Sequence, residues 1–435
     1  MARRTYAIVG TGGRHQMYRD ALLGRFADTA RLVALCDANA GRLVMSLAVA
    51  RARSNESIGG YAAEQFDALL TERRPQTVIV TSMDSTHDEY ICRAMAAGCD
   101  VITEKPLTIS AAKLKRIVDT QARTGATLTV AFNYRYSPVR SQVKRALLDG
   151  VVGEITAVDF QWLLDTRHGA DYFRRWHRNK ANSGGLLVHK ATHHFDLVNW
   201  WLESVPQTVH ATGERRYYRP EQAERLGLGA RGERCHGCAA RGDCPFHFDI
   251  TARDGLKAMY YDQERYDGYQ RDQCVFSAAI DIEDTMSVRV RYLNGATMTY
   301  SLYAYAPWEG YRIAFNGTAG RLEHEVRESS YASGDGSAPG ASLGASIRVF
   351  PHFAEPYALE PARASGGHGG GDRVMLDDLL GAASGASDPL QRRADYRAGA
   401  WSILTGIAAN LSIGEGRAVQ VGDLVSGLDW PDTVT

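Results

Sequence analysis

The sequence carries no excess of either charge, few cysteines and no long apolar run. Lys+Arg and Asp+Glu both number 50 among 435 residues, and this balance argues against a protein held on nucleic acid by bulk positive charge. Seven cysteines are too few to indicate a disulfide scaffold in a chain of this length. No apolar run has the length of a membrane span, and the N-terminal residues lack the apolar region of a secretory signal peptide. These absences predict a cytoplasmic globular protein. The length of 435 residues is enough for two or three domains.

A strand, a glycine turn and a helix follow one another near the N-terminus. The apolar residues 6–9 predict the strand, and Gly10, Gly12 and Gly13 form the turn. Glycines at such a turn let the backbone approach a pyrophosphate at the N-terminus of the helix. The third glycine of the usual dinucleotide pattern is absent, because His15 stands there. The turn on its own is therefore weak support for a dinucleotide site.

Asp37 ends the next predicted strand, which covers residues 32–36. An acid about 20 residues after the glycine turn accepts hydrogen bonds from the ribose hydroxyls of a dinucleotide. Its charge disfavours a 2′-phosphate, so Asp37 favours NAD over NADP. Arg42 weakens this preference, because it can pair with such a phosphate. The alternative for Asp37 is the N-cap of the following helix.

Lys105 stands at the end of another predicted strand. Residues 77–81 and 100–102 are apolar runs separated by a predicted helix, a pattern typical of a parallel sheet. Ligands bind at the carboxyl ends of the strands in such sheets, and Pro106 stiffens the backbone beside Lys105. An ammonium held there suits hydride chemistry, in which the carbinol oxygen needs a donor as its charge changes. The alternative is a surface lysine before a loop proline.

Taken together, these features resemble the Gfo/Idh/MocA family of oxidoreductases. The resemblance rests on the glycine turn, on Asp37, on the turn over residues 81–87 and on the Glu104-Lys105-Pro106 motif. It implies an enzyme that transfers hydride between NAD(P) and a secondary alcohol of a sugar, a sugar derivative or a cyclic polyol. The residues that we predict to hold the cofactor are Gly10, Gly12, Gly13, Arg14, Asp37, Arg42, Thr81, Ser82, His87, Glu104 and Lys105.

The resemblance also implies the architecture. An N-terminal α/β Rossmann domain with a parallel sheet is expected over residues 1–130. A C-terminal α/β domain with an open, mostly antiparallel sheet is expected over residues 131–435, for substrate binding and oligomerisation. In this family the open sheet face often pairs with another subunit, so the resemblance predicts a homodimer or homotetramer.

A row of histidines forms a second candidate centre. On a helix, His189 and His193 share one face, and Lys190 and His194 form an adjacent row. Imidazole suits general acid–base work near neutral pH. In the family an aspartate usually precedes a histidine by one helical turn; His193 matches that histidine, whereas His189 stands where the aspartate is usual. We therefore expect Lys105 and His193 to be catalytic, with His189 or Lys190 as an added contact or an alternative base.

Two alternatives remain for this histidine row. The first is a set of structural histidines on an amphipathic helix. The second is a metal site, because histidines four positions apart are a known ligand spacing.

Aromatic residues alternate with cations over residues 171–178, which suits sugar hydroxyls and the apolar faces of sugars. The alternative is a solvated loop.

His368 lies in a glycine-rich segment that resembles one in NAD-dependent glycosidases of the same superfamily, although a flexible linker is the alternative. That segment supports a second hypothesis, a hydrolase or lyase that cleaves a glycoside through a transient keto-sugar. A third hypothesis is a non-catalytic sensor. The residues that we predict to bind substrate are Lys105, Arg135, Trp162, Arg175, Trp176, His177, His194 and His368.

A Cys-rich insertion occupies about residues 219–275. Cys235, Cys238 and Cys244 follow a Cys-x2-Cys-x5-Cys spacing, which predicts a structural zinc bound by thiolates. Cys274 is the preferred fourth ligand. Free thiols and an iron–sulfur cluster are the alternatives.

Overall fold

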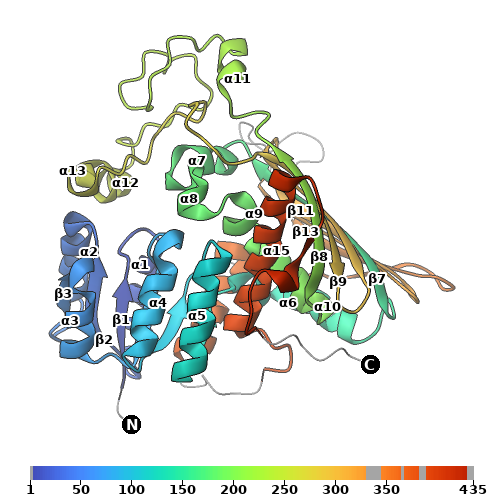
Figure 1. Cartoon of the computed structure of the whole chain (residues 1–435), viewed down its shortest axis with the longest axis horizontal. Helices are drawn as coiled ribbons and strands as arrows, with labels where there is room; N and C mark the ends of the chain where they lie inside the picture. The colour runs from blue at the N-terminus through green and yellow to red at the C-terminus, as the bar shows by residue number, and fades with distance from the viewer. Residues whose placement is uncertain (1–2, 330–343, 364–366, 382–387, 429–435) are drawn as a thin grey trace.

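Two β-sheets, with helices between and around them, make up the protein (Figure 1). The structure, a computed structural model, describes residues 3–329, 344–363, 367–381 and 388–428. Among these residues, no helix is both long and apolar enough to cross a bilayer. The predicted fold class, a Rossmann domain followed by a domain with a mostly antiparallel sheet, is confirmed.

The first sheet has seven strands in the order β15-β6-β5-β4-β1-β2-β3. Its central strands are short runs of β-branched and apolar residues that are buried on both faces, as parallel strands covered by helices must be. All neighbours are parallel except β15, which pairs antiparallel with β6. The strands are β1 (Arg4–Val9), β2 (Ala30–Asp37), β3 (Gly59–Ala62), β4 (Thr77–Val80), β5 (Asp100–Thr103), β6 (Leu128–Val130) and β15 (Ala394–Asp395).

Helices connect these strands and pack on the sheet. The Asn39 side chain caps α2 by accepting a hydrogen bond from the amide of Arg42, and Ser110 caps α5 in the same way. The helices of this part of the chain are α1 (His15–Leu22), α2 (Ala40–Ala52), α3 (Phe66–Arg73), α4 (His87–Ala96) and α5 (Ala111–Thr124). The short 3-10 turns are η1 (Ala63–Gln65), η2 (Asp84–Thr86) and η3 (Asn133–Tyr136).

The chain returns to the first sheet near its C-terminus. Helix α14 (Gly371–Leu380) follows η6 (Gly367–Gly370) and places Met375 and Leu379 in one apolar cluster with Tyr18 and Leu22. Strand β15 then extends the sheet beside β6. Residues from far along the chain therefore support the sheet edge that carries the glycine turn.

The second sheet has nine strands in the order β14-β13-β12-β11-β7-β10-β9-β8-β16. Strands β7 and β10 are parallel, and every other neighbouring pair is antiparallel. The strands are β7 (Ile155–Asp165), β8 (Pro206–Glu214), β9 (Thr285–Tyr292), β10 (Thr297–Ala306), β11 (Glu309–Gly317), β12 (Gly320–Ser329), β13 (Gly344–Pro351), β14 (Tyr357–Leu359) and β16 (Val419–Gln420).

In the described part of the chain, helices cover the face of this sheet that looks toward the first domain, and none lies on its other face, called the bare face below (Figure 1). Side chains along β9 and β10 alternate between buried and accessible, as expected for a sheet covered on one face. The helices of this layer and its flanks are α6 (Pro138–Leu148), α7 (His168–Arg174), η4 (Trp176–Arg178), α8 (Lys180–Ser183), α9 (Leu186–His189), α10 (Thr192–Leu202), α15 (Tyr396–Glu415) and η7 (Val421–Asp423).

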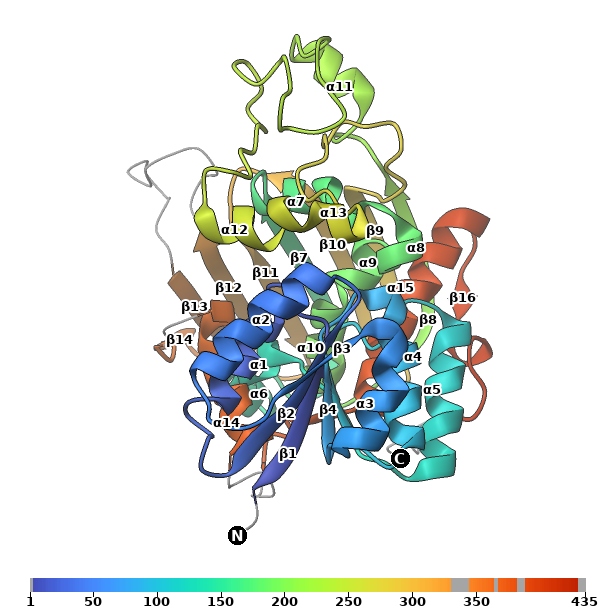
Figure 2. The same cartoon turned by 90° about the vertical axis from the view of Figure 1, so that its left-hand side faces the viewer.

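The Cys-rich insertion joins β8 to β9. It extends from the end of the second sheet, and two of its helices lie over the end of α2 in both views (Figures 1 and 2). Its short helices are α11 (Pro220–Arg225), α12 (Asp254–Met259), η5 (Tyr261–Gln263) and α13 (Glu264–Asp267).

Candidate active site

The glycine turn lies where β1 and β4 end side by side. Gly10 has a φ of +90°, and a Cβ added there would lie 2.5 Å from the amide nitrogen of Ser82. The Thr81 hydroxyl donates a hydrogen bond of 2.6 Å to the carbonyl oxygen of Gly10. Only glycine fits this conformation and this close approach. The turn therefore presents bare backbone at the carboxyl edge of the sheet, the arrangement that a dinucleotide phosphate requires.

Asp37 lies beside this turn, at the end of β2. Its carboxylate accepts hydrogen bonds from the Thr11 hydroxyl at 2.8 Å and from the amide of Asn39 at 2.6 Å. Because Asn39 is the residue that caps α2, the alternative that Asp37 is the N-cap is wrong. Arg42 Nη2 lies 3.5 Å from the Asp37 carboxylate. The acid predicted to bind the ribose and the arginine that could bind a 2′-phosphate are thus adjacent.

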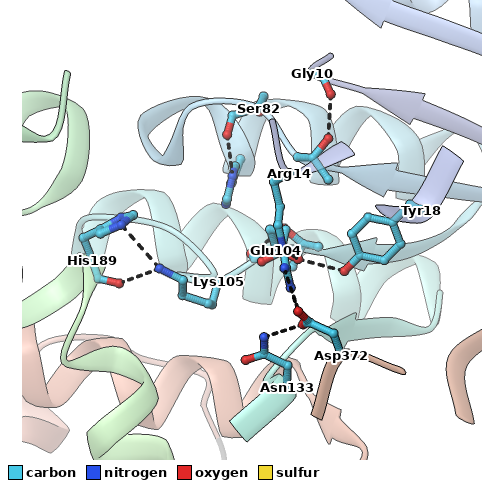
Figure 3. Close-up of polar contacts among 12 residues, drawn as sticks. Gly10, Arg14, Tyr18, Ser82, Glu104, Lys105, Asn133, His189 and Asp372 are labelled. Carbon is cyan, nitrogen blue, oxygen red and sulfur yellow. Dashed lines mark hydrogen bonds and ion pairs between the residues drawn. The ribbon is translucent and has the colours of Figure 1, made fainter. Parts of the chain in front are cut away.

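Glu104 ties the end of β5 to α1 (Figure 3). Its carboxylate accepts hydrogen bonds from Arg14 Nε at 2.6 Å and from the Tyr18 hydroxyl at 2.8 Å. Arg14 also binds Asp372 at 3.1 Å, and Asp372 accepts a hydrogen bond of 2.7 Å from the amide of Asn133. Burial, together with the Glu104 charge, raises the pKa of Tyr18 well above its ordinary value, so this phenol stays a donor. The network holds the backbone on which Lys105 stands.

Lys105 points from the end of β5 toward the second domain (Figure 3). Its Nζ donates a hydrogen bond of 3.0 Å to the carbonyl oxygen of His189 and lies 3.4 Å from the Nε2 atom of the same residue. The Lys105–Pro106 peptide bond is cis, and the His87 ring lies between the carbonyl oxygens of Pro106 and Ser82, at 2.8 and 3.2 Å. Burial lowers the pKa of Lys105 to about 8; Asp84 opposes this shift and Lys190 adds to it. A lysine with such a pKa can give or take a proton near neutral pH.

Asp84 supplies an acid that the sequence argument missed. It lies in η2, after β4, and its Oδ2 is 2.5 Å from Nδ1 of His189. Burial lowers the pKa of His189 well below its ordinary value, and the charges of Lys105 and Arg175 act in the same direction. When Asp84 is ionised, a neutral His189 donates from Nδ1 to its carboxylate and leaves Nε2 as an acceptor facing Lys105. Burial raises the pKa of Asp84, and the charge of Lys105 opposes this shift. Asp84, His189 and Lys105 therefore form one hydrogen-bonded array across the two domains.

The predicted continuous helix through the histidine row is interrupted. Helix α9 ends at His189 and α10 begins at Thr192, with Lys190 between them. The His193 ring stacks on Tyr134, with ring centroids 4.2 Å apart. In this row, His189 contacts Lys105 through its carbonyl oxygen and its Nε2 atom. The role of His193 as the general base stays a prediction.

Lys190 and His194 lie against aromatic rings. Lys190 Nζ donates to the Tyr134 hydroxyl at 3.2 Å and stands 5.0 Å from the centre of the Trp162 ring. His194 stacks on the other aromatic neighbour, Trp162, at 3.8 Å, and its Nδ1 lies 2.7 Å from the Tyr300 hydroxyl. Within the described parts of the chain, Lys190 forms no ion pair with a carboxylate. Its charge is stabilised instead by ring faces and a phenol.

The aromatic and cationic residues 171–178 extend to the array of Lys105 and His189. Trp176 stacks on His177 at 3.7 Å, and the His177 ring meets the His189 ring edge-on at 4.2 Å. Arg175 lies 3.4 Å from Asp171. The structure thus brings the predicted residues Lys105, His189, His177 and Trp176 together from three separate segments.

One predicted substrate contact is engaged elsewhere in the protein, and a second cannot be followed in the described residues. Arg135 binds both carboxylate oxygens of Asp196, at 2.8 and 2.6 Å, and donates to the carbonyl oxygen of Gln391 at 3.2 Å. This buried pair engages the guanidinium fully and links η3 to α10. His368 lies in η6, and its side chain is outside the described part of the structure.

The zinc prediction finds no support in the described residues, none of which form a group of three or more His, Cys, Asp or Glu side chains able to hold a metal. Cys235, Cys238, Cys244 and Cys274 do line one narrow cavity. However, Arg174 Nη1 stands 3.6 Å from the Cys235 sulfur, and burial raises the pKa of three of these thiols, Cys235, Cys244 and Cys274. All four are free cysteines. His189 and His193 also belong to no such metal-binding group among the described residues.

Comparisons with known proteins identify the family of the chain. The profile described as "Oxidoreductase family, NAD-binding Rossmann fold" matches residues 4–132, and that described as "Oxidoreductase family, C-terminal alpha/beta domain" matches residues 144–421. The chain belongs to the Gfo/Idh/MocA oxidoreductase family. The resemblance noted in the sequence is confirmed, and the chain is an oxidoreductase with a Rossmann domain for a nicotinamide cofactor.

Three similar proteins illustrate the range of this Gfo/Idh/MocA family. The Bacillus subtilis (strain 168) protein YteT, named as an oxidoreductase, is 36% identical over 422 residues, which are 94% of this chain and 95% of YteT. Inositol 2-dehydrogenase of Rhizobium meliloti (strain 1021) is 28% identical over 209 residues, which are 48% of this chain and 57% of that protein. A solved structure of levoglucosan dehydrogenase, in complex with NADH and L-sorbose, covers 97% of this chain and 99% of its own with a TM-score of 0.67 and 16% identity. The last comparison shows the shared fold.

Proposed function

We propose that the chain is an NAD-dependent dehydrogenase that oxidises a secondary alcohol of a sugar, a sugar derivative or a cyclic polyol. The observation that carries the proposal is the array of Asp84, His189 and Lys105, in which a buried amine of lowered pKa stands at the carboxyl edge of the parallel sheet. The similarity to an inositol dehydrogenase supports the substrate class. Asp37 beside the glycine turn supports NAD as the cofactor.

The residues of the first domain fit a dinucleotide. The glycine turn at Gly10, Gly12 and Gly13 would hold the pyrophosphate, and Asp37 would hold the ribose hydroxyls. When bound, the nicotinamide supplies the hydride acceptor for the oxidised carbon. Lys105 follows the end of β5, on the same edge of the sheet as the glycine turn, which supports a position for its amine near the nicotinamide.

The proton of the substrate hydroxyl then goes to the protein. In its neutral form, Lys105 Nζ takes this proton, which its pKa of about 8 permits. His189 orients the amine through its carbonyl oxygen and Nε2, and Asp84 fixes the tautomer of His189 through Nδ1. The developing carbonyl is stabilised by the ammonium that results, so the same residue serves as base and as electrostatic partner.

Aromatic and cationic side chains frame the substrate position. Trp176 and His177 pack against His189, and Lys190 lies over Trp162. Flat rings suit the apolar faces of a sugar or cyclitol, and the lysine and imidazole groups suit its hydroxyls. This combination supports a carbohydrate or polyol over a simple alcohol.

A panel of aldoses, glycosides, sugar nucleotides and inositols, assayed by the absorbance of NADH, tests the proposal. We expect net NADH formation and a keto product for at least one member. Cleavage of a glycoside without net NADH would favour the hydrolase or lyase alternative. Binding of NAD with no turnover across the panel would favour a sensor.

The same assay separates the two candidate histidines. If His189 orients Lys105, His189→Asn lowers kcat more than His193→Asn does. The reverse order would restore His193 as the general base.

We infer further that the bare face of the second sheet pairs with a second copy of the chain. A hollow of about 770 Å³ on this face is lined by groups of both signs, with Arg289, Arg312, Arg321 and Arg348 near Asp159, Glu323 and Glu325. Such a mixed surface is complementary to itself about a two-fold axis. A homodimer is therefore the expected assembly.

A further inference from the structure

The Cys-rich insertion reaches across to the cofactor edge of the first domain. The Tyr260 hydroxyl accepts a hydrogen bond of 3.0 Å from the amide of Gly13. Asp267, at the end of α13, lies 2.7 Å from Arg42 Nη2. Figures 1 and 2 show α12 and α13 over the end of α2 from two directions. The insertion therefore contacts the glycine turn and the loop after β2, the two segments that would hold a dinucleotide.

The contact between insertion and first domain is close-packed. The carbonyl oxygen of Gln263 accepts a hydrogen bond of 3.0 Å from the side-chain amide of Asn39. A Cβ added at Gly41 would lie 1.8 Å from the Gln263 side chain and 2.5 Å from Tyr266. The glycine at position 41 thus lets the side chains of the insertion pack directly on the first turn of α2.

The insertion is also anchored on its other side. Arg234 binds both carboxylate oxygens of Glu264, at 2.8 and 2.7 Å, and Asp272 at 2.5 Å. Asp272, which is fully buried, also accepts a hydrogen bond of 2.8 Å from the amide of His236. Ion pairs thus connect α13 to the cysteine segment, and Arg271 binds Asp171 of α7 at 3.2 Å. Residues 254–272 therefore contact the first domain on one side, and the cysteine segment and α7 on the other.

Three charged groups meet where the insertion contacts the first domain, and they bear on which dinucleotide the site accepts. Arg42 stands between two carboxylates, Asp37 at 3.5 Å and Asp267 at 2.7 Å. Its side chain is 13% exposed and that of Asp267 22%, so solvent screens the pair only in part. The three groups together carry one negative charge. An arginine so paired is not available to a 2′-phosphate, and the second carboxylate repels one.

We propose that Asp267, contributed by the insertion, makes the dinucleotide site selective for NAD by holding Arg42 and by opposing the 2′-phosphate of NADP. The inference rests on the proposed function, because it concerns the same cofactor site. It assigns to the Cys-rich insertion a direct part in cofactor recognition. Asp37 alone leaves Arg42 free to serve a phosphate, whereas Asp37 and Asp267 together do not.

Calorimetric titration of the full-length protein with NAD and with NADP tests this. Asp267→Asn keeps the size of the side chain and removes its charge. Asp262→Asn is the matched control, because Asp262 lies in the same insertion and pairs with Lys257 at 2.7 Å, a contact within the insertion. Thermal unfolding of each variant verifies that it is folded. The double variant Arg42→Ala/Asp267→Asn shows whether Arg42 is the group that Asp267 restrains.

The parent should bind NAD more tightly than NADP. Asp267→Asn should shift the ratio of the two dissociation constants toward NADP by about tenfold, the scale of one partly screened charge, and the Arg42→Ala background should remove most of this gain. Asp262→Asn should leave the ratio unchanged. A ratio within twofold of the parent in Asp267→Asn, an equal shift in Asp262→Asn, or a parent that prefers NADP would overturn the inference. A parent that binds neither dinucleotide would overturn the proposed function instead.

Discussion

Asp84 Oδ2 lies 2.5 Å from Nδ1 of His189, although 105 residues separate the two in the chain. Asp84 belongs to the first domain and His189 to the helix layer of the second, so the contact joins the two domains. The usual aspartate of the Gfo/Idh/MocA histidine motif is replaced here by His189. The carboxylate therefore comes from the other domain and acts on the histidine that took its place.

Removing this carboxylate should slow turnover. Asp84→Asn cannot accept from Nδ1 of His189 in the same way, so the imidazole loses its fixed tautomer and Lys105 its orientation. We expect kcat to fall by about 10²-fold, the scale of lost acid–base assistance, with little change in the dissociation constant for NAD. Steady-state kinetics and calorimetry measure the two quantities. Glu89→Gln, on the exposed side of α4, is the control and should behave as the parent. Equal losses of NAD binding and kcat would show that Asp84 only supports the fold.

Activity should depend on pH through Lys105. Its pKa is about 8 in the folded protein, because burial disfavours the ammonium form. In the proposed mechanism the neutral amine is the base, so kcat/KM for alcohol oxidation should rise with pH and level off above about 8. Lys105→Arg keeps the charge but cannot lose its proton; this variant should lose the inflection and about 10²-fold in kcat. An unchanged profile in the variant would assign the inflection to another group.

The same shift has a consequence for stability. Between about 8 and 10.5 the unfolded chain still binds the Lys105 proton and the folded protein does not. Stability attributable to this residue therefore increases with pH through that window. The difference in unfolding free energy between parent and Lys105→Met should follow this trend.

Arg135 and Asp196 should prove to be a structural pair. Both side chains are buried, at 7% and 1% exposure, and they share two hydrogen bonds. Asp196→Asn leaves the guanidinium buried without its counter-charge and should lower the free energy of unfolding by about 3–5 kcal/mol. Urea unfolding measures the change. Asp119→Asn, which breaks the exposed pair with Lys115, should cost at most about 0.5 kcal/mol. A stable Asp196→Asn protein with a raised KM would return Arg135 to the substrate site.

The local motifs were enough to predict most of the first domain. Apolar runs followed by glycine or by Glu104-Lys105 marked the strand ends, and these ends meet in one edge of the sheet. Strand β3 was not predicted because Gly59 and Gly60 interrupt its apolar pattern. Strand β15 was not predicted because it has only two residues. Both are held in place by neighbouring strands rather than by their own propensity.

The candidate site was predicted in part. Lys105 and the histidine row stood out through their spacing, but spacing alone did not show which imidazole faces the lysine. That choice depends on the break between α9 and α10 and on Asp84, a contact of long sequence separation. Arg135 was assigned to substrate because nothing in its own segment reveals Asp196 as its partner. The contact of Asp267 with Arg42 was not predicted for the same reason, since 225 residues separate the two in the chain.

Gly10 should be irreplaceable for a backbone reason. Its φ of +90° strains any other residue, and an added Cβ would meet the Ser82 amide at 2.5 Å. Gly10→Ala should therefore lower the free energy of unfolding by about 2 kcal/mol or more and weaken NAD binding. Gly98→Ala is a matched control, because Gly98 has a φ of +83° but no atom within 4 Å of its Cβ position. That variant should cost about 1 kcal/mol and bind NAD normally. Equal effects in both would mean that strain alone, without the close approach, sets the cost.

The bare face of the second sheet should carry the dimer contact. Gln161 on β7 and Ser301 on β10 are register partners at the centre of this sheet, and both line the hollow on that face. Arginine at both positions would place like charges opposite one another across a two-fold axis, which is strongly unfavourable. Light scattering coupled to size-exclusion chromatography should then show the mass of one 47.7-kDa chain instead of a dimer. Thr71→Arg, on the exposed side of α3, should leave the parent assembly intact. A dimer that survives Gln161→Arg/Ser301→Arg, with its fold preserved, would place the subunit contact on another surface.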